Sequence, residues 1–428
     1  MPGASLNTRR NKRMGLDPIA THAARVSRWS AIALGASIPV STALDNVLLV
    51  VILATWALSG QAQATVNLLF KNKYLWCPVL LFGMLALGTL YGDSPRREAF
   101  STLGKYADLL CIPVFAIILR ERADRITALH AFAISIAIVV ILSYLTRWEV
   151  LPALPFITGD TASPTVFKQR ITHSILVAFG AFLFAWLGSI SINPKQRLVW
   201  FSLALLAALN VVFLVKGATG YLTLSALIVL LAWERLGWRG TAYGVLGLAA
   251  LYSVLVAVPS SFQERVTLIQ QEVQQWRTDE ASAAVSSSGL RLEFYHNTLK
   301  IIAAHPLIGV GTGGFPRAYA RQVEGSGKTT THNPHNEFMN IGAQIGVIGL
   351  LVLIAMFWKQ WQSAKDLDSP MEQALARGLV LAMVTGCMVN SLLLDHAEGL
   401  FYAWLSGLLC GGLSGLKYSL SEKLPAQT

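Results

Sequence analysis

Residues 171–191 read ITHSILVAFGAFLFAWLGSIS, with no charged side chain between Arg170 and Lys195. An apolar run of about 18 residues or more is long enough to cross a bilayer as a helix. Similar runs recur along all 428 residues, of which 54% are hydrophobic and 13% are charged. A soluble domain carries about a quarter charged residues, so this chain has too few to cover a globule. The sequence therefore predicts an all-α polytopic membrane protein.

The apolar runs predict about twelve spans, at 30–43, 45–60, 74–91, 101–119, 126–146, 171–191, 197–215, 217–233, 241–258, 343–360, 373–393 and 398–416. The first two run together around Asp45 and could be one kinked helix, which would leave eleven. Lysine and arginine favour cytoplasmic loops, and twelve spans with a cytoplasmic N-terminus place most of them there. The net charge of +11 then faces anionic lipid headgroups and implies no nucleic acid. We expect both termini in the cytoplasm.

This topology divides the chain into three parts. Residues 1–258 hold the first nine spans, residues 259–342 form one large polar loop outside the cytoplasm, and residues 343–428 hold the last three spans. The chemically distinctive residues fall in or beside the large loop. We therefore expect the functional site there.

The sharpest motif of the loop is THNPHNE, at residues 331–337. Asn333 is a good N-cap and Pro334 suits the first helical position, which predicts His335 in the first turn of a helix. The helix dipole favours a neutral imidazole there, which can act as a general base near neutral pH, and it also favours a nearby phosphate. The alternative is a polar helix cap at a membrane boundary.

Upstream, residues 289–306 predict an amphipathic helix ended by Pro306. Arg291, Tyr295 and Ile302 share one face of it, at spacings of four and seven. Arginine offers a planar fork for phosphate oxygens, so Arg291 is a candidate phosphate ligand. A helix that merely anchors to lipid headgroups fits the pattern equally well.

The glycines that follow spell GxGxxG at Gly309, Gly311 and Gly314. No βαβ unit surrounds them, and the predicted topology puts them outside the cytoplasm, which excludes a dinucleotide site. A flexible turn that lets the backbone approach a ligand or the membrane is the better interpretation.

Further cations lie on the same side of the membrane. Arg170 and Lys216 each precede a span, and Arg265 follows the last span before the large loop. Each could be a snorkelling anchor at a helix end, or together they could converge on one anionic group. Elsewhere, Lys105 could pair with Asp108, and the Asp-His-Ala-Glu run at 395–398 predicts a solvated turn. The sequence contains no recognisable metal-ligand, Walker or nucleophile-elbow motif, so we expect no metal and no cofactor.

Over residues 291–349 the sequence resembles the O-antigen ligase family of bacterial inner-membrane glycosyltransferases. The resemblance rests on Arg291 with Tyr295, on HPLIGVGTGGF at 305–315, and on His335-Asn336 followed by Gly346 and Gly349. It implies a GT-C-like glycosyltransferase with about twelve transmembrane helices and one large periplasmic loop that contains short helices.

The resemblance also implies a reaction, which is the metal-independent transfer of O-antigen polysaccharide from undecaprenyl diphosphate to the outer core of lipid A-core, with inversion, at the periplasmic face. The family's essential histidine corresponds to His335, and the arginine of its large loop corresponds to Arg291. A further family arginine, in a Ser-Arg-Gly-like turn, corresponds to Lys216, where lysine keeps the charge but loses the bidentate fork. We expect the donor diphosphate to be bound by Arg170, Lys216, Arg265 and Arg291, with support for the site from Asn336, Glu337, His332 and Tyr295.

Three other functions remain open at this point. O-antigen polymerases use the same donor but tend to carry two sizeable periplasmic loops. Protein O-oligosaccharyltransferases tend to be longer, with extra C-terminal soluble regions. A membrane transporter of an anionic substrate is the alternative from another class, although transporters usually carry charges or broken helices near the bilayer midplane, often in paired halves.

Overall fold

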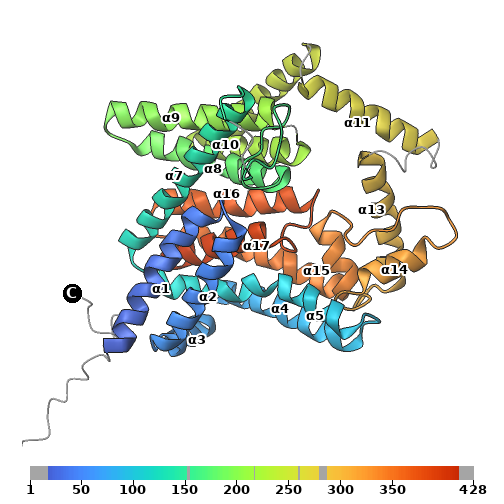
Figure 1. Cartoon of the computed structure of the whole chain (residues 1–428), viewed down its shortest axis with the longest axis horizontal. Helices are drawn as coiled ribbons and strands as arrows, with labels where there is room; N and C mark the ends of the chain where they lie inside the picture. The colour runs from blue at the N-terminus through green and yellow to red at the C-terminus, as the bar shows by residue number, and fades with distance from the viewer. Residues whose placement is uncertain (1–17, 152–154, 216, 259–260, 279–286, 414–428) are drawn as a thin grey trace, which may run out of the picture.

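The computed structural model describes residues 18–151, 155–215, 217–258, 261–278 and 287–413 (Figure 1). Within these ranges the chain is helical, as predicted, and its only β contacts are isolated bridges such as Ile157–Val166. The elements in chain order are α1 (Pro18–Ser37), α2 (Thr42–Leu58), α3 (Ala62–Lys71), α4 (Lys73–Tyr91), α5 (Arg96–Lys105), η1 (Ala107–Cys111), α6 (Ile112–Ile118), α7 (Arg122–Arg147), α8 (Arg170–Ile190), α9 (Pro194–Leu209), η2 (Asn210–Leu214), α10 (Ala218–Ala257), α11 (Ser261–Thr278), α13 (Ser287–Ala304), α14 (Phe315–Gln322), α15 (Glu337–Ser363), η3 (Ala364–Asp366), α16 (Pro370–Cys387) and α17 (His396–Cys410).

Among the described residues, 6 helical stretches are long and apolar enough to cross a membrane, namely α4, α7, α8, α9 with η2, α10, and α15 with η3. Two bent pairs, α2 with α3 and α5 with η1 and α6, meet the same test together, which gives up to 8. The chain is therefore a multi-pass membrane protein. The count of twelve spans stays a prediction, because α1, α16 and the 15-residue α17 do not meet this test.

The first two predicted spans correspond to two helices and not to one kinked helix, and Ser41 marks the boundary between them. Its side chain accepts a hydrogen bond from the Leu44 amide (3.3 Å), so it caps α2, and α1 and α2 are separate helices that lie side by side. The helix α1 begins at Pro18, earlier in the sequence than the start of the first predicted span at residue 30. Hydropathy misses those early turns because they carry polar residues such as His22 and Arg25.

The spans predicted at 217–233 and 241–258 are the two arms of α10. The backbone reverses at Gly237, whose φ of +61° lies in the left-handed region that glycine tolerates. Tyr252 of the second arm consequently contacts Ser225 and the Tyr221 carbonyl of the first. The two arms are antiparallel, as two successive spans must be.

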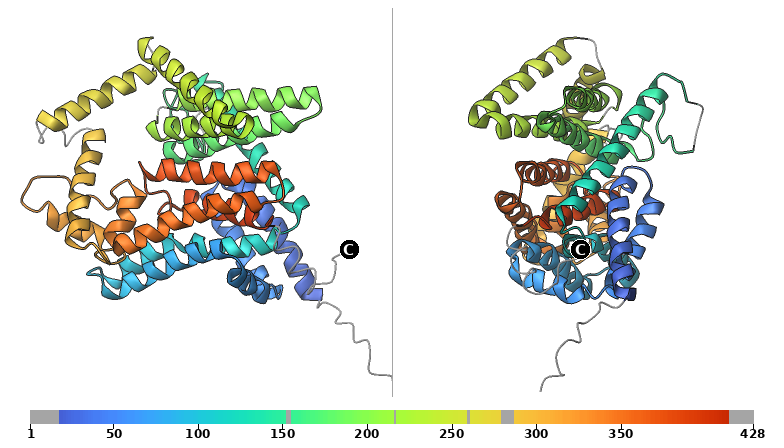
Figure 2. Two further views of the ribbon diagram at one scale, coloured as in Figure 1. Left: turned by 180° about the vertical axis from the view of Figure 1, so that it is seen from behind. Right: turned by 90° about the vertical axis from the view of Figure 1, so that its left-hand side faces the viewer.

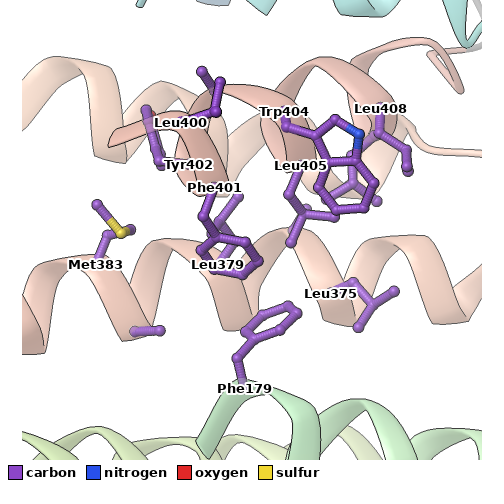
Figure 3. Close-up of a cluster of buried hydrophobic side chains, with 14 of the residues drawn as sticks. Phe179, Leu375, Leu379, Met383, Leu400, Phe401, Tyr402, Trp404, Leu405 and Leu408 are labelled. Carbon is purple, nitrogen blue, oxygen red and sulfur yellow. The ribbon is translucent and has the colours of Figure 1, made fainter. Parts of the chain in front are cut away.

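The core lies where α8, α16 and α17 meet, with α7 beside them (Figure 3). Phe179 of α8 packs edge-on against Phe401 of α17 at 5.3 Å between ring centroids, and Phe132 of α7 stacks on Phe401 at 5.4 Å. Trp404 is fully buried, and its Nε1 donates to the Ala31 carbonyl of α1 (2.9 Å). Buried aromatic packing of this kind fixes the positions of the helices whose ends build the candidate site.

One end of the bundle is where α8, α10, α15 and α17 begin, and we call it the site end. α11, α13 and α14, which belong to the predicted loop, gather at this end (Figures 1 and 2). At the opposite end the buried Arg125 guanidinium bonds Glu372 Oε1 (2.8 Å) and Asp368 Oδ2 (3.0 Å) and thereby joins the start of α7 to the start of α16. A buried arginine paired in this way resists separation, because removing one partner leaves a buried charge uncompensated.

Candidate active site

His335 lies in a tight turn before α15 rather than in the first turn of a helix. The helix begins at Glu337, and its N-cap is Asn336, whose Oδ1 accepts from the Met339 amide (3.0 Å). The predicted cap at Asn333 is wrong, because its Oδ1 instead accepts from the His335 amide (2.8 Å) and from Ser391 Oγ (2.7 Å). His335 adopts a φ of +55°, a conformation that is uncommon for residues other than glycine.

The imidazole of His335 is half-buried beside α13. It stacks on the Phe294 ring with 6.2 Å between centroids and an interplanar angle of 25°. Burial lowers the pKa of His335, and the positive charge of Arg291 lowers it further. The neutral imidazole that the sequence predicts is therefore favoured, although burial and Arg291 are the causes here rather than the helix dipole.

The face of α13 that carries Arg291, Tyr295 and Ile302 lies toward α15 and the turn before it. The Tyr295 hydroxyl donates to the His335 carbonyl (3.1 Å), and Arg291 lies one turn earlier, close enough to act on both His335 and Tyr295. Ile302, further along the same face, lies against Gly342 of α15. The helix ends at Ala304, just before Pro306, as predicted. A helix that only anchors to headgroups would not make these contacts to the His335 turn.

Arg170 and the turn at Gly217 lie side by side. A Cβ at Gly217 would be 3.8 Å from Arg170 Cγ. Two residues on, Thr219 Oγ1 accepts from Asn390 Nδ2 (2.8 Å), and the Asn390 carbonyl accepts from the Glu337 amide (3.1 Å). These contacts connect the start of α8 to the turn that holds His335. Lys216 itself lies outside the described residues.

Arg265 lies in α11, and its side chain lies outside the described residues. The helix is held against α10 by Phe262, which stacks on Tyr252 at 5.0 Å and packs edge-on against Tyr221 at 5.2 Å. The structure therefore attaches this part of α11 to the first arm of α10, which begins beside Arg170.

Several helices start at the site end within contact of one another. Thr172 of α8 donates to Glu398 Oε1 of α17 (2.6 Å), and the Leu393 amide before α17 donates to Glu337 Oε2 of α15 (2.9 Å). The start of each helix carries a partial positive charge and unpaired amides, which favour bound anions. Arg170 begins α8, and Arg291 lies close to His335, so this end of the bundle carries cations as well as helix starts.

Glu337 faces inward and not toward the open side of the turn. Its side chain is fully buried, and Oε1 accepts from the Tyr106 hydroxyl (2.7 Å). Tyr106 in turn accepts from Asn340 Nδ2 (2.9 Å), and Asn340 Oδ1 accepts from Gln344 Nε2 (3.1 Å). This buried series of hydrogen bonds holds the start of α15 in place. His332, by contrast, is exposed.

The glycine-rich stretch at 309–314 is not a flexible turn, and that interpretation is wrong. It packs against a break in α15 at Ile345 and Gly346, where φ is −129° and +70°. The break deprives two nearby carbonyls and one nearby amide of their helical partners, so loop groups replace those partners. The replacement bonds are Val310 N to Ala343 O (2.9 Å), Gly311 N to Gln344 O (2.9 Å) and Val347 N to Pro306 O (2.8 Å).

Sequence reasoning missed the residues between α16 and α17. Ser391 and Asn390 are buried, and they bond the His335 turn through the Ser391 hydroxyl and the Asn390 carbonyl. The solvated turn predicted at 395–398 is wrong, since Glu398 is buried and His396 Nδ1 lies 3.2 Å from Asp108 Oδ2. That contact also replaces the suggested partnership of Asp108 with Lys105. The available signal was that five of residues 390–398 are polar, namely Asn390, Ser391, Asp395, His396 and Glu398.

In the part of the chain that the structure describes, no group of three or more His, Cys, Asp or Glu side chains could hold a metal ion. The site does bring an imidazole of lowered pKa together with the positive charge of Arg291. Such a set can accept a proton and stabilise negative charge on a leaving group.

Comparison with known families gives one match. Residues 201–354 match a family model described as O-antigen ligase. The matched region runs from α9 into α15 and includes the Gly217 turn, Arg291 and His335. No curated protein matches the chain.

Proposed function

We propose that this chain, which belongs to the O-antigen ligase family, transfers O-antigen polysaccharide from undecaprenyl diphosphate to the outer core of lipid A-core. The reaction takes place at the periplasmic face of the bacterial inner membrane. The observation that carries the proposal is the His335 turn, where a half-buried imidazole of lowered pKa lies beside Arg291 within the matched region. Members of this family are ligases and polymerases that act on lipid-linked polysaccharides.

The donor diphosphate is bound by cations. Arg291 and Arg170 lie at the site end, and the proposed set also includes Lys216 and Arg265. Fixed positive charges and helix N-termini stabilise the charge that grows on the diphosphate as its bond to the sugar breaks. Lys216 supplies charge without the bidentate fork, and Arg170, which lies beside the Gly217 turn, supplies the guanidinium.

His335 is the general base. It removes the proton from the acceptor sugar hydroxyl, whose oxygen attacks the anomeric carbon from the face opposite the diphosphate. The new carbon–oxygen bond forms as the bond to the diphosphate oxygen breaks, and undecaprenyl diphosphate leaves with that electron pair. The configuration at the anomeric carbon is inverted. A lowered pKa keeps the imidazole neutral and able to accept this proton near neutral pH.

The supporting residues act in different ways. Tyr295 donates to the His335 carbonyl, and Asn336 caps α15 while its Nδ2 donates to the Met388 carbonyl (2.8 Å). Glu337 is turned away into the protein, so it supports His335 through the backbone. His332 is exposed and is available to the acceptor glycan.

The test is a reaction of the purified protein with an undecaprenyl diphosphate-linked glycan and lipid A-core. We expect a glycan–lipid A-core conjugate. In a parallel reaction, a second lipid-linked glycan replaces lipid A-core. Elongation of that glycan with no conjugate in the first reaction would make the protein a polymerase, and substrate uptake into vesicles with no transfer in either would make it a transporter.

A further inference from the structure

The segment that joins α16 to α17, residues 388–395, runs along the His335 turn and bonds it repeatedly. The contacts are Ser391 Oγ to Asn333 Oδ1 (2.7 Å), Asn336 Nδ2 to Met388 O (2.8 Å), Glu337 N to Asn390 O (3.1 Å), and Leu393 N to Glu337 Oε2 (2.9 Å). They reach residues on both sides of His335. The turn is therefore held by a segment that lies more than fifty residues further along the chain.

The turn needs such support because of its backbone. His335 has a φ of +55°, which costs energy in a residue with a side chain and persists only where the surroundings impose it. The bond from the His335 amide to Asn333 Oδ1 (2.8 Å) closes the turn locally. Ser391 donates to that same oxygen, so it orients the Asn333 amide that defines the turn.

The segment is itself immobilised. Ser391 and Asn390 are almost fully buried, and Asn390 Nδ2 donates to Thr219 Oγ1 at the start of α10 (2.8 Å). The support of the turn is thus fixed to the helix whose start lies beside Arg170. A fixed support can hold a side chain to the precision that proton transfer requires.

We propose that Ser391, acting through Asn333, is the positioning residue that sets the orientation of the His335 imidazole. This inference rests on the proposed function, because positioning matters for transfer only if His335 is the base. The Ser391 hydroxyl donates to Asn333 Oδ1, which in turn accepts from the His335 amide. Its effect is therefore on the geometry and enclosure of His335.

The experiment compares Ser391→Ala with Ser406→Ala. Ser406 is also a fully buried serine, and it accepts from Gln360 Nε2 (2.9 Å) within the bundle rather than at the site. For Ser391→Ala we expect kcat to fall about tenfold and KM for the donor to change less than about twofold, because positioning acts on the chemical step. For Ser406→Ala we expect neither change.

Two readouts separate positioning from a general structural role. Arg291 of α13 is the charged group that acts on the pKa of His335, and the Ser391→Ala variant keeps it. A shift in the pKa of His335 in this variant therefore reports a change in the burial of the imidazole. A loosened turn exposes the imidazole, so the acid limb of the pH–rate profile should move to higher pH. The rate at which diethyl pyrocarbonate modifies His335, measured by peptide mass spectrometry without substrate, should rise. A serine that only stabilises the fold would shift neither quantity.

Asn333→Ala is a second variant, in case Ser391→Ala does not fold. It removes the acceptor of the same hydrogen bond, and Asn333 is only half-buried. It should shift both readouts in the same direction, and adding Ser391→Ala to it should change them little further. Wild-type kcat, pH profile and modification rate in Ser391→Ala would overturn the inference while leaving the proposed function intact. A wild-type protein that transfers no glycan would overturn the proposed function, and the modification rate would still test whether Ser391 encloses His335.

Discussion

The glycine-rich stretch offers a matched test of whether it is a packed structural element. Gly309 and Gly325 both have positive φ, +68° and +72°, so alanine at either position costs about 1–2 kcal/mol in backbone strain. A Cβ at Gly325 meets nothing within 4 Å, whereas a Cβ at Gly309 lies 2.5 Å from the backbone of Ala343 and Gln344. Any difference between Gly309→Ala and Gly325→Ala therefore measures packing against α15.

The size of that difference follows from the bonds at the contact. Relieving the clash at Gly309 moves the loop by about 1 Å from α15, which breaks the bonds from Val310 N to Ala343 O and from Gly311 N to Gln344 O. Each buried hydrogen bond broken in this way costs about 1–3 kcal/mol. We expect Gly309→Ala to be less stable than Gly325→Ala by about 2–6 kcal/mol.

The assay is thermal unfolding of the purified variants in one detergent. Gly325→Ala should unfold within a few degrees of wild type, and Gly309→Ala should unfold at a clearly lower temperature or fail to purify as a single species. Equal melting temperatures for the two variants would refute the packed loop and restore the flexible turn.

Three further predictions concern the site and its topology. Arg291→Ala should abolish transfer while Arg291→Lys keeps part of it, because the positive charge of the side chain matters more for binding the diphosphate than the bidentate fork. The control is Arg317→Ala, because Arg317 is exposed and its partner Glu98 is 3.7 Å away; equal loss of transfer in Arg291→Ala and Arg317→Ala would point to an effect on the fold. In cells with an opened outer membrane, Ser326→Cys should react with an impermeant thiol reagent and Gln196→Cys should not, and the reverse pattern would invert the topology. The transfer rate should fall only as pH drops through a value below about 6.5, because burial and Arg291 lower the pKa of His335 and only the neutral imidazole accepts a proton; a midpoint above that value would contradict the assignment.

The sequence predicted what depends on local patterns. Apolar runs predicted an all-helical multi-pass protein, and the spacing of Arg291 and Tyr295 placed them on the face of α13 that meets the His335 turn. The end of α13 before Pro306 was also correct, because proline stops helices by a local steric effect.

What the sequence did not predict depends on contacts between distant residues. Asn336 and not Asn333 caps α15, in part because Ser391 donates a hydrogen bond to the side-chain oxygen of Asn333. The burial of Glu398 depends on Thr172, which lies on another helix. No window along the sequence contains these partners.

The most direct test of the central claim compares wild type, His335→Ala and His332→Ala in the conjugation reaction with excess EDTA. The wild type should form the conjugate at its usual rate, since the described residues include no metal-binding cluster and cations take that role. His335→Ala should lose about 10²–10⁴-fold in rate, the usual contribution of a general base, while His332→Ala loses far less. Wild-type rates in His335→Ala would remove the proposed base, and loss of wild-type activity in EDTA that magnesium or manganese restores would contradict the cation-only mechanism.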